Sequence, residues 1–181
     1  AVLAELHPEP VLVGGVAVAF ESVGLATGFP YGSYTYSEVL GPTLLGVPFL
    51  VPLAWLMMAW PSWLLGGRLA RPVRPARRRA ARIAWSAAVF AGWDVVLDPQ
   101  MVQAGYWTWA NPTPGLPGID TVPLTNLAGW LVAGAVLMTL LDLLGRGEVL
   151  VDVAAGHEPG QDVLVGLAAL GLPVGLVGSA H

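Results

Sequence analysis

Residues 80–102, AARIAWSAAVFAGWDVVLDPQMV, are mostly apolar and contain 23 residues. A helix needs about 20 such residues to cross a lipid bilayer. Four other segments have a similar length and composition. We therefore predict an all-α fold, a polytopic transmembrane helical bundle that forms a single domain over residues 1–181. The five expected spans are residues 10–28, 42–66, 80–102, 124–144 and 163–180.

The composition of the whole chain indicates a membrane protein. Of its 181 residues, 55% are hydrophobic and only 11% are charged, whereas a soluble domain carries about 25% charged residues. So little charge cannot cover a surface that faces water on all sides. The net charge of −4 and the lack of a broad basic face also argue against nucleic acid as a partner.

Two residue types are absent, and their absence excludes several chemistries. A chain without cysteine has no disulfides, thiolate metal sites or cysteine nucleophiles. A chain without lysine cannot form the Schiff base that retinal and pyridoxal chemistry require. None of the three histidines has a partner at metal-ligand spacing, and no phosphate-binding or dinucleotide-binding motif occurs. The sequence therefore shows no recognisable metal site and no motif for these cofactors.

Arginines predict the orientation in the membrane. Seven of the eight lie in the short link between the second and third spans, and the positive-inside rule places such a link in the cytoplasm. The N-terminus is then also inside, the protein lies in the cell membrane, and the first residues show no signal-peptide pattern. The seven arginines are Arg68, Arg71, Arg74, Arg77, Arg78, Arg79 and Arg82.

The two links expected on the outer face are rich in aromatic residues. The first, FPYGSYTYSEVLGP at residues 29–42, contains Tyr31, Tyr34 and Tyr36 and then Glu38. The second, QAGYWTWANPTPGLPGIDTVP, occupies residues 103–123. Single tyrosines and tryptophans at an interface usually anchor a protein in the membrane. Three tyrosines within six residues exceed that need, so both anchoring and a functional role stay open.

Ionisable residues inside a span are expensive, and for that reason they indicate function. Glu21 in the first span and Asp94 in the third come to roughly 10–12 Å below the outer interface at the helical rise per residue. Asp98 is four residues from Asp94 and shares its helix face. Asn126, near the outer start of the fourth span, completes a polar ring. Acidic residues at the inner ends of spans, such as Asp142, are expected to be solvated.

This pattern predicts an outward-opening, aromatic cavity that holds two or three carboxyl groups. Apolar surroundings favour the protonated form of a carboxyl group. A protonated acid can give its proton to an alkene, and aromatic faces can stabilise the resulting cation. The same groups could equally serve a small proton-coupled transporter, so the pattern alone leaves both functions open.

Four motifs occur in order along the chain. They are ESVGLATGFPYGSYTY at residues 21–36, LGVP with PLAW at 45–48 and 52–55, DVVLDP with GYWTW at 94–99 and 105–109, and PLTN with GW at 123–126 and 129–130. These motifs resemble the membrane carotenoid 1,2-hydratases (the CruF and bisanhydrobacterioruberin hydratase group), and together they cover roughly residues 15–135. The family is longer than this chain, and residues 112–121 are richer in proline and glycine than its pattern.

The resemblance implies addition of water across the terminal 1,2 double bond of a linear carotenoid end group, without a cofactor, to give a tertiary alcohol. It implies catalytic roles among Glu21, Glu38, Asp94 and Asp98. It also implies a substrate site lined by aromatic residues and an amide, to which we add Trp93 beside Asp94. The residues expected to bind the substrate are Tyr31, Tyr34, Tyr36, Trp93, Tyr106, Trp107, Trp109 and Asn126.

We expect Asp94, with Glu21 as second candidate, to protonate C2 of the end group, which places the positive charge on the tertiary C1. Asp98 or Glu38 then holds the attacking water. The expected partners are a carotenoid or other polyene lipid, the bilayer and other membrane enzymes of carotenoid synthesis. Two alternatives remain, a proton-coupled transporter and a carotenoid-binding subunit without catalysis.

Overall fold

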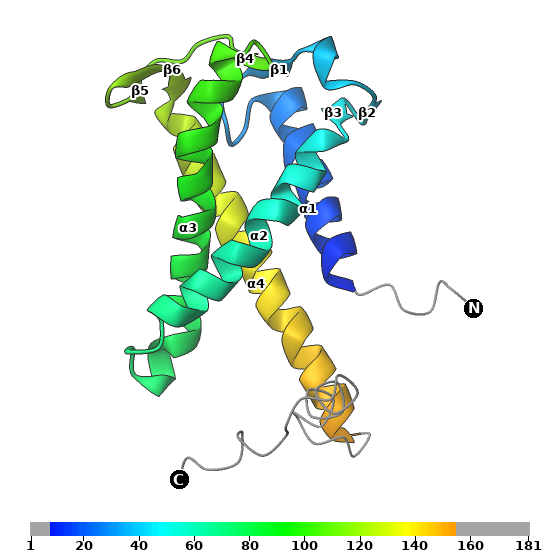
Figure 1. Cartoon of the computed structure of the whole chain (residues 1–181), viewed down its shortest axis with the longest axis vertical. Helices are drawn as coiled ribbons and strands as arrows, with labels where there is room; N and C mark the ends of the chain where they lie inside the picture. Colours follow the sequence, from blue (N-terminus) through cyan, green and yellow to red (C-terminus); the bar gives the residue numbers. More distant parts are fainter. Residues whose placement is uncertain (1–7, 155–181) are drawn as a thin grey trace, which may run out of the picture. The chain divides into compact units, whose positions relative to one another are not determined.

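The computed structural model describes the backbone of residues 8–154 and the side chains of residues 8–145. Long helices alternate with links that contain short strands (Figure 1). The elements, in chain order, are α1 (Pro8–Thr27), β1 (Tyr34–Tyr36), the 3-10 helix η2 (Glu38–Leu40), β2 (Thr43–Leu44), β3 (Val47–Pro48), α2 (Leu50–Leu69), α3 (Pro75–Gln103), β4 (Trp107–Trp109), β5 (Gly115–Leu116), β6 (Ile119–Pro123) and α4 (Leu124–Ala154).

Four helices in the described part of the chain are long and apolar enough to cross a membrane. They are α1, α2, α3 and the first 22 residues of α4, Leu124–Gly145. The all-α transmembrane prediction is therefore confirmed, and four of the expected spans correspond to these helices. The fifth expected span, residues 163–180, lies outside the described residues.

The predicted start of the second span was wrong. Residues 42–49 do not begin a helix, because Thr43–Leu44 and Val47–Pro48 pair as the antiparallel hairpin β2–β3. Its two turn residues, Leu45 and Gly46, have φ values of 53° and 82°, and positive φ at both central positions suits the twist of a two-residue hairpin. Helix α2 starts only at Leu50. A short apolar run cannot by itself distinguish a strand from a helix.

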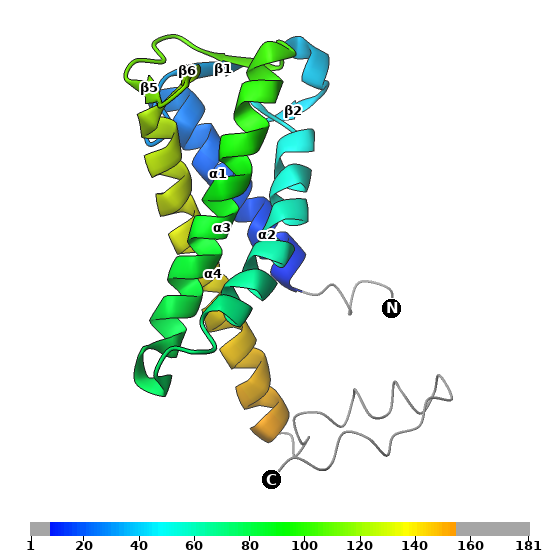
Figure 2. The same cartoon turned by 60° about the vertical axis from the view of Figure 1, so that its left-hand side comes forward.

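The chain divides into two compact units at Leu141. Within the first unit, α2 packs beside both α1 and α3 (Figure 2). Its core contains one large ring from each of three helices: Trp55 of α2, Phe90 of α3 and Trp130 of α4, with ring centroids 4.9–5.3 Å apart. Through these ring contacts α4 packs against both α2 and α3.

Many large apolar side chains of the first unit face outward from the helices. Met57, Trp60 and Val96 expose 66%, 58% and 61% of their surface. A protein in water rarely exposes apolar surface on this scale, whereas lipid accepts it.

Asp142, the first residue of the second unit, is only 2% exposed. The expectation that it is solvated was wrong, because the place of a residue within a span does not reveal what covers it.

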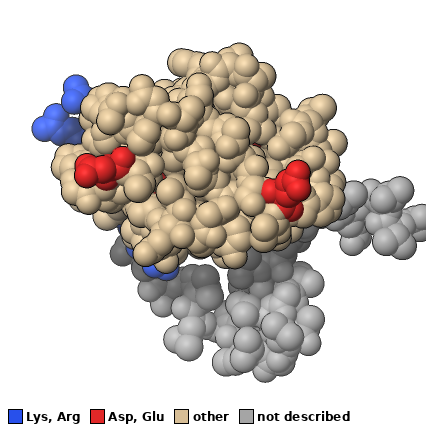
Figure 3. Space-filling model, turned by 90° about the horizontal axis from the view of Figure 1, so that it is seen from above, with Lys and Arg blue, Asp and Glu red and all other residues tan. Residues whose placement is uncertain are grey.

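The two ends of the first unit differ in character. All the strands lie at one end of the helices, and the link between α2 and α3, residues 70–74, lies at the other (Figure 1). Most of the strand end carries neither acidic nor basic side chains (Figure 3). The seven arginines between Arg68 and Arg82, in this link and in the adjoining helix ends, therefore lie at the opposite end from the aromatic links, as the predicted topology requires.

Candidate active site

The two aromatic links pair with each other as one small sheet. Strand β1 (Tyr34–Tyr36) lies antiparallel to β4 (Trp107–Trp109), and each residue of β1 pairs with one residue of β4. Side chains alternate between the two faces of a strand. Thr35 and Thr108 therefore share the outer face, with their hydroxyl oxygens 3.4 Å apart, and both are exposed.

The inner face of this sheet consists of aromatic rings. Tyr34 lies opposite Trp109 and Tyr36 opposite Trp107, with ring centroids 6.1 and 5.8 Å apart. Cross-strand aromatic pairs of this kind stabilise a sheet. The tyrosines and tryptophans of both links thus come from sequence positions about 70 residues apart and form one wall.

This wall holds Glu21 of α1. The hydroxyl groups of Tyr34 and Tyr36 donate hydrogen bonds of 2.5 and 2.8 Å to the same carboxyl oxygen, Oε2. Glu21 is 3% exposed. Two phenol donors on one oxygen fix the orientation of the carboxyl group and satisfy part of its need for hydrogen bonds.

A second carboxyl cluster joins α3 and α4. Nδ2 of Asn126 donates to Oδ2 of Asp94 at 2.7 Å and to Oδ2 of Asp98, so a single amide nitrogen uses both of its hydrogens on two carboxyl groups. All three residues are at most 3% exposed. The expected common face of Asp94 and Asp98 is therefore present, and Asn126 holds the pair together.

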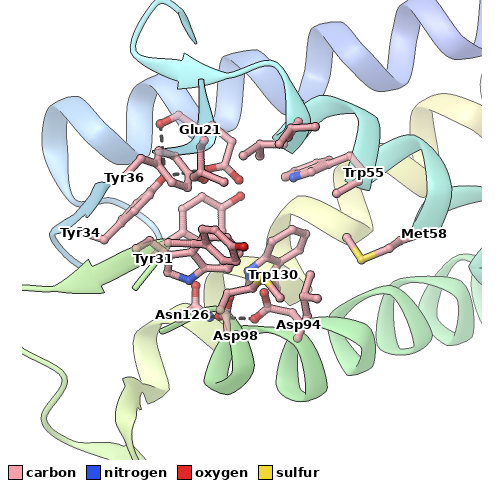
Figure 4. Close-up of a pocket in the computed structure, with 18 of the residues that line it drawn as sticks. Glu21, Tyr31, Tyr34, Tyr36, Trp55, Met58, Asp94, Asp98, Asn126 and Trp130 are labelled. Atoms are coloured by element: carbon pink, nitrogen blue, oxygen red, sulfur yellow. Dashed lines mark hydrogen bonds between the residues drawn. The ribbon is translucent and has the colours of Figure 1, made fainter. Parts of the chain in front are cut away.

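Both clusters line one cavity of about 420 Å³ (Figure 4). In Figure 4, Glu21 lies on one side of the cavity, and Asp94, Asp98 and Asn126 lie on the other. Aromatic and aliphatic side chains form most of the remaining wall. The lining residues are Glu21, Tyr31, Tyr34, Tyr36, Val39, Leu40, Leu50, Val51, Ala54, Trp55, Met57, Met58, Asp94, Leu97, Asp98, Met101, Tyr106, Trp107, Trp109, Asn126 and Trp130.

Tyr31 enters the bundle between two glycines. A Cβ atom on Gly24 of α1 would lie 2.9 Å from the Tyr31 ring, and one on Gly129 of α4 would lie 2.6 Å from it. Only glycine therefore leaves room for the ring at these positions. The backbone oxygen of Tyr31 also accepts a 3.1 Å hydrogen bond from the indole of Trp109. The sequence GFPYG thus bends inward and places a phenol in the cavity wall.

The three tyrosines of this region remain neutral. Burial raises the pKa of the Tyr31, Tyr34 and Tyr36 hydroxyls above the ordinary value, and the negative charge of Glu21 raises each pKa further. None of the residues that line the cavity is cationic. Hydrogen bonds rather than ion pairs therefore support the carboxyl groups. Among the described residues, no group of three or more potential ligands could hold a metal ion.

Most of the residues expected in the site lie together in the cavity wall, but two do not. Glu38 is exposed in η2 and does not line the cavity, since the chain turns away after β1. Trp93 is 46% exposed on the outside of α3, because one step along a helix rotates a side chain by about 100° away from Asp94. The other ten expected residues line the cavity: Glu21, Tyr31, Tyr34, Tyr36, Asp94, Asp98, Tyr106, Trp107, Trp109 and Asn126.

Three buried residues of the wall were not expected there: Trp55, Met58 and Trp130. Trp55 and Trp130 belong to the quoted motifs PLAW and GW, which could have indicated them. Met58 follows Trp55 by three residues and so shares its helix face. Met58 belongs to no motif, and an apolar residue within a transmembrane helix does not by itself reveal whether it faces lipid or a cavity.

The rim of the cavity includes exposed apolar side chains. Val39, Leu50 and Met57 line the cavity and expose 78%, 56% and 66% of their surface. Leu50 and Met57 belong to α2, one of the helices able to cross a membrane. The cavity therefore reaches an apolar edge beside a transmembrane helix, where the hydrocarbon part of a lipid-soluble molecule can enter.

Fold and site together define a helical membrane protein with a carboxyl-bearing, aromatic-walled cavity. The model of the carotenoid biosynthesis protein family matches residues 8–177, and the chain belongs to that family. It is also 37% identical over 128 residues to the bisanhydrobacterioruberin hydratase of Haloarcula japonica, a match that covers 67% of this chain and 40% of that protein. The chain thus spans less than half of this relative. No solved structure matches it.

Proposed function

We propose that this chain catalyses the addition of water to the terminal 1,2 double bond of a linear carotenoid end group, without a cofactor. The observation that carries the proposal is one apolar cavity with two separate carboxyl clusters in its wall. Membership of the carotenoid biosynthesis family supports a carotenoid substrate. The hydratase named above, similar over two thirds of this chain, supports hydration as the reaction.

In the proposed reaction, Asp94 gives a proton to C2 of the end group, and Glu21 is the second candidate for this acid. Two carboxyl groups that share one amide donor carry a single negative charge more readily than two. Asp94 and Asp98 can therefore hold one proton between them, ready for transfer. Asn126 supports whichever of the two is ionised.

Protonation at C2 leaves a cation at the tertiary C1. Aromatic faces stabilise a cation that lies over them, and the cavity offers several, including those of Trp107, Trp109 and Trp130. Asp98, or Glu21 on the other side, then takes a proton from the water that attacks C1. Glu38 has no part in this scheme because it is exposed and outside the cavity wall.

We also propose an orientation in the cell membrane. The arginine-rich link between α2 and α3 faces the cytoplasm and the strand end faces outward, as the positive-inside rule predicts. The polyene tail of the substrate leaves the cavity beside Leu50 and Met57 and lies in the lipid.

The test is expression of the chain in a host that makes lycopene, followed by mass spectrometry of the extracted pigments. We expect a gain of one water for each hydrated end. Asp94→Asn keeps the shape and a hydrogen-bonding group but loses the acid, so conversion should fall by about a hundredfold or more, the usual scale for a lost general acid.

Asp120→Asn is the matched control, because Asp120 is exposed in β6 and does not line the cavity. It should convert lycopene as the wild type does. An Asp94→Asn protein that is folded and fully active would exclude Asp94 as the acid. Bound but unmodified lycopene in the wild type would favour a carotenoid-binding subunit without catalysis.

A further inference from the structure

Two polar groups in the cavity wall have no partner in the described part of the chain. They are the hydroxyl group of Tyr31 and the indole N–H of Trp55, both fully buried atoms without a hydrogen bond of standard geometry. The Glu21 carboxyl group lies near the Trp55 N–H, without closing a hydrogen bond of that geometry. Tyr31 is 2% exposed and Trp55 is 0% exposed. A buried donor without an acceptor costs stability, so two in one cavity wall indicate an acceptor that belongs to a ligand.

Both groups are held firmly, and both lie close to the carboxyl clusters. The rings of Tyr31 and Trp55 pack against Trp130, with centroids 5.8 and 4.9 Å from its ring. The Tyr31 ring also lies 6.1 Å from the ring of Tyr34, whose hydroxyl group holds Glu21. In Figure 4 the Trp55 indole nitrogen is on the side of its ring that faces Glu21. The two donors therefore border the space between the carboxyl clusters.

The chemistry of the donors restricts what they can bind. An indole N–H only donates, so its partner must be an acceptor, whereas a phenol can both donate and accept. The end group of a linear hydrocarbon carotenoid has no acceptor atom. In a hydration reaction the only oxygen is that of the water, which becomes the hydroxyl group of the product.

We propose that Tyr31 and Trp55 hold the water molecule that is added to the substrate, an inference that rests on the proposed hydration. Trp55 donates to one lone pair of the water, and the other lone pair forms the bond to C1. The water hydrogens point to the Tyr31 oxygen and to the Glu21 carboxylate.

As the C1–O bond forms, one O–H bond of the water breaks and its proton passes to Glu21. Asp94 has already given a proton to C2, so the substrate gains one hydrogen and one hydroxyl group. The protein then carries its proton on Glu21 instead of Asp94. Return of that proton to Asp94 restores the starting state, and no oxidant or reductant takes part.

The experiment incubates membranes that contain the full chain and lycopene in deuterated buffer. Mass spectrometry measures hydrated lycopene and the deuterium in unhydrated lycopene. Tyr31→Phe keeps the ring and removes only the hydroxyl group. Trp55→Phe keeps an aromatic ring, smaller than the indole, and removes the N–H group. Each should slow hydration by about tenfold or more, the scale of a lost hydrogen bond to a reacting group.

The deuterium content of unhydrated lycopene distinguishes residues that hold the water from residues that have only a structural role. Without a held water, the C1 cation returns to the alkene by losing a proton from C2, which then carries one hydrogen and one deuterium. When the hydrogen is lost, to Asp94 after rotation about the C2–C3 bond or to Asp98, the unhydrated lycopene keeps the deuterium. We therefore expect the ratio of deuterated lycopene to hydrated product to rise in both variants. Ser86→Ala is the control, because the Ser86 hydroxyl is also buried without a partner among the described residues but does not line the cavity. It should behave as wild type.

Wild-type hydration in both variants would overturn the water site and leave the proposed function intact. An equal fall of hydration and of deuterium uptake would also overturn it, because that result assigns the two residues to protonation or to folding. A wild-type protein that forms no hydrated product would overturn the proposed function, and the water site with it.

Discussion

Asn126 shows how much a single side chain can decide in this cavity. Its Nδ2 atom has two hydrogens, and each bonds one of the two aspartates of α3. Neither a carboxyl group nor an apolar side chain of similar size offers two donors from one atom. Asn126 is a short polar residue at the start of α4, yet the arrangement of Asp94 and Asp98 depends on it.

We therefore predict that Asn126→Leu destabilises the protein by about 1–3 kcal/mol, the cost of leaving buried acceptors without a donor. Carotenoid conversion should fall as well, because the two carboxyl groups lose their common support. Thermal unfolding of the purified protein in detergent measures the first effect, and pigment analysis measures the second.

The control for this prediction is Asn111→Leu. Asn111 is exposed and bonds only its neighbour Thr113 in the described structure, so its loss should change the stability by no more than about 0.5 kcal/mol. Equal stability and activity of Asn126→Leu and the wild type would show that Asn126 is not needed to hold the pair.

At the scale of elements, the site depends on how closely the links approach the helices. The segment before β1 lies against α4 at Gly129, where an added Cβ would be 3.0 Å from the backbone of Pro30 as well as 2.6 Å from the Tyr31 ring. Backbone atoms cannot move aside as the end of a flexible side chain can. The approach of this link to α4 therefore requires glycine.

Gly129→Ala should displace Tyr31 and destabilise the protein by about 1–3 kcal/mol, the usual cost of overpacking. Gly92→Ala is the matched change in α3, because nothing lies within 4 Å of its added Cβ. That substitution should stabilise the helix by about 0.5–1 kcal/mol. Thermal unfolding of both variants in detergent is the measurement, and a similar melting temperature for the two would contradict the close approach.

For the molecule as a whole, the charge distribution predicts which side of the membrane each end faces. The seven arginines between Arg68 and Arg82 belong to the end opposite the strands. The chain contains no cysteine. Labelling of a single introduced cysteine therefore shows on which side of the membrane that residue lies. Ala76, in the arginine-rich region, and Asn111, in an aromatic link, are both exposed and suit this purpose.

We expect Asn111→Cys to react with a membrane-impermeant maleimide in intact cells, and Ala76→Cys to react only after the cells are opened. The reason is that arginine-rich links remain on the cytoplasmic side. The cysteine-free wild type is the blank for both measurements. The opposite pattern of labelling would reverse the proposed orientation while leaving the fold unaffected.

The sequence by itself determined the membrane class, the four described spans and the acidic residues within them. These features are readable because lipid imposes a simple rule of length and apolarity on each span, and because a carboxyl group inside a span is too costly to occur without a reason. This rule does not distinguish a short apolar strand from the start of a helix. It therefore predicts helix for residues 42–49, which contain the hairpin β2–β3 instead.

Only the tertiary structure decided which residues share the cavity. Pairing of β1 with β4 unites tyrosines and tryptophans that are distant in sequence, and the aromatic core places Trp55 and Trp130 in the cavity wall while Glu38 stays outside. The physical reason is that inside a bilayer both neighbouring protein and lipid are apolar. Hydropathy therefore shows that a residue lies within the membrane, but only packing determines whether it faces a lipid, a helix or a substrate.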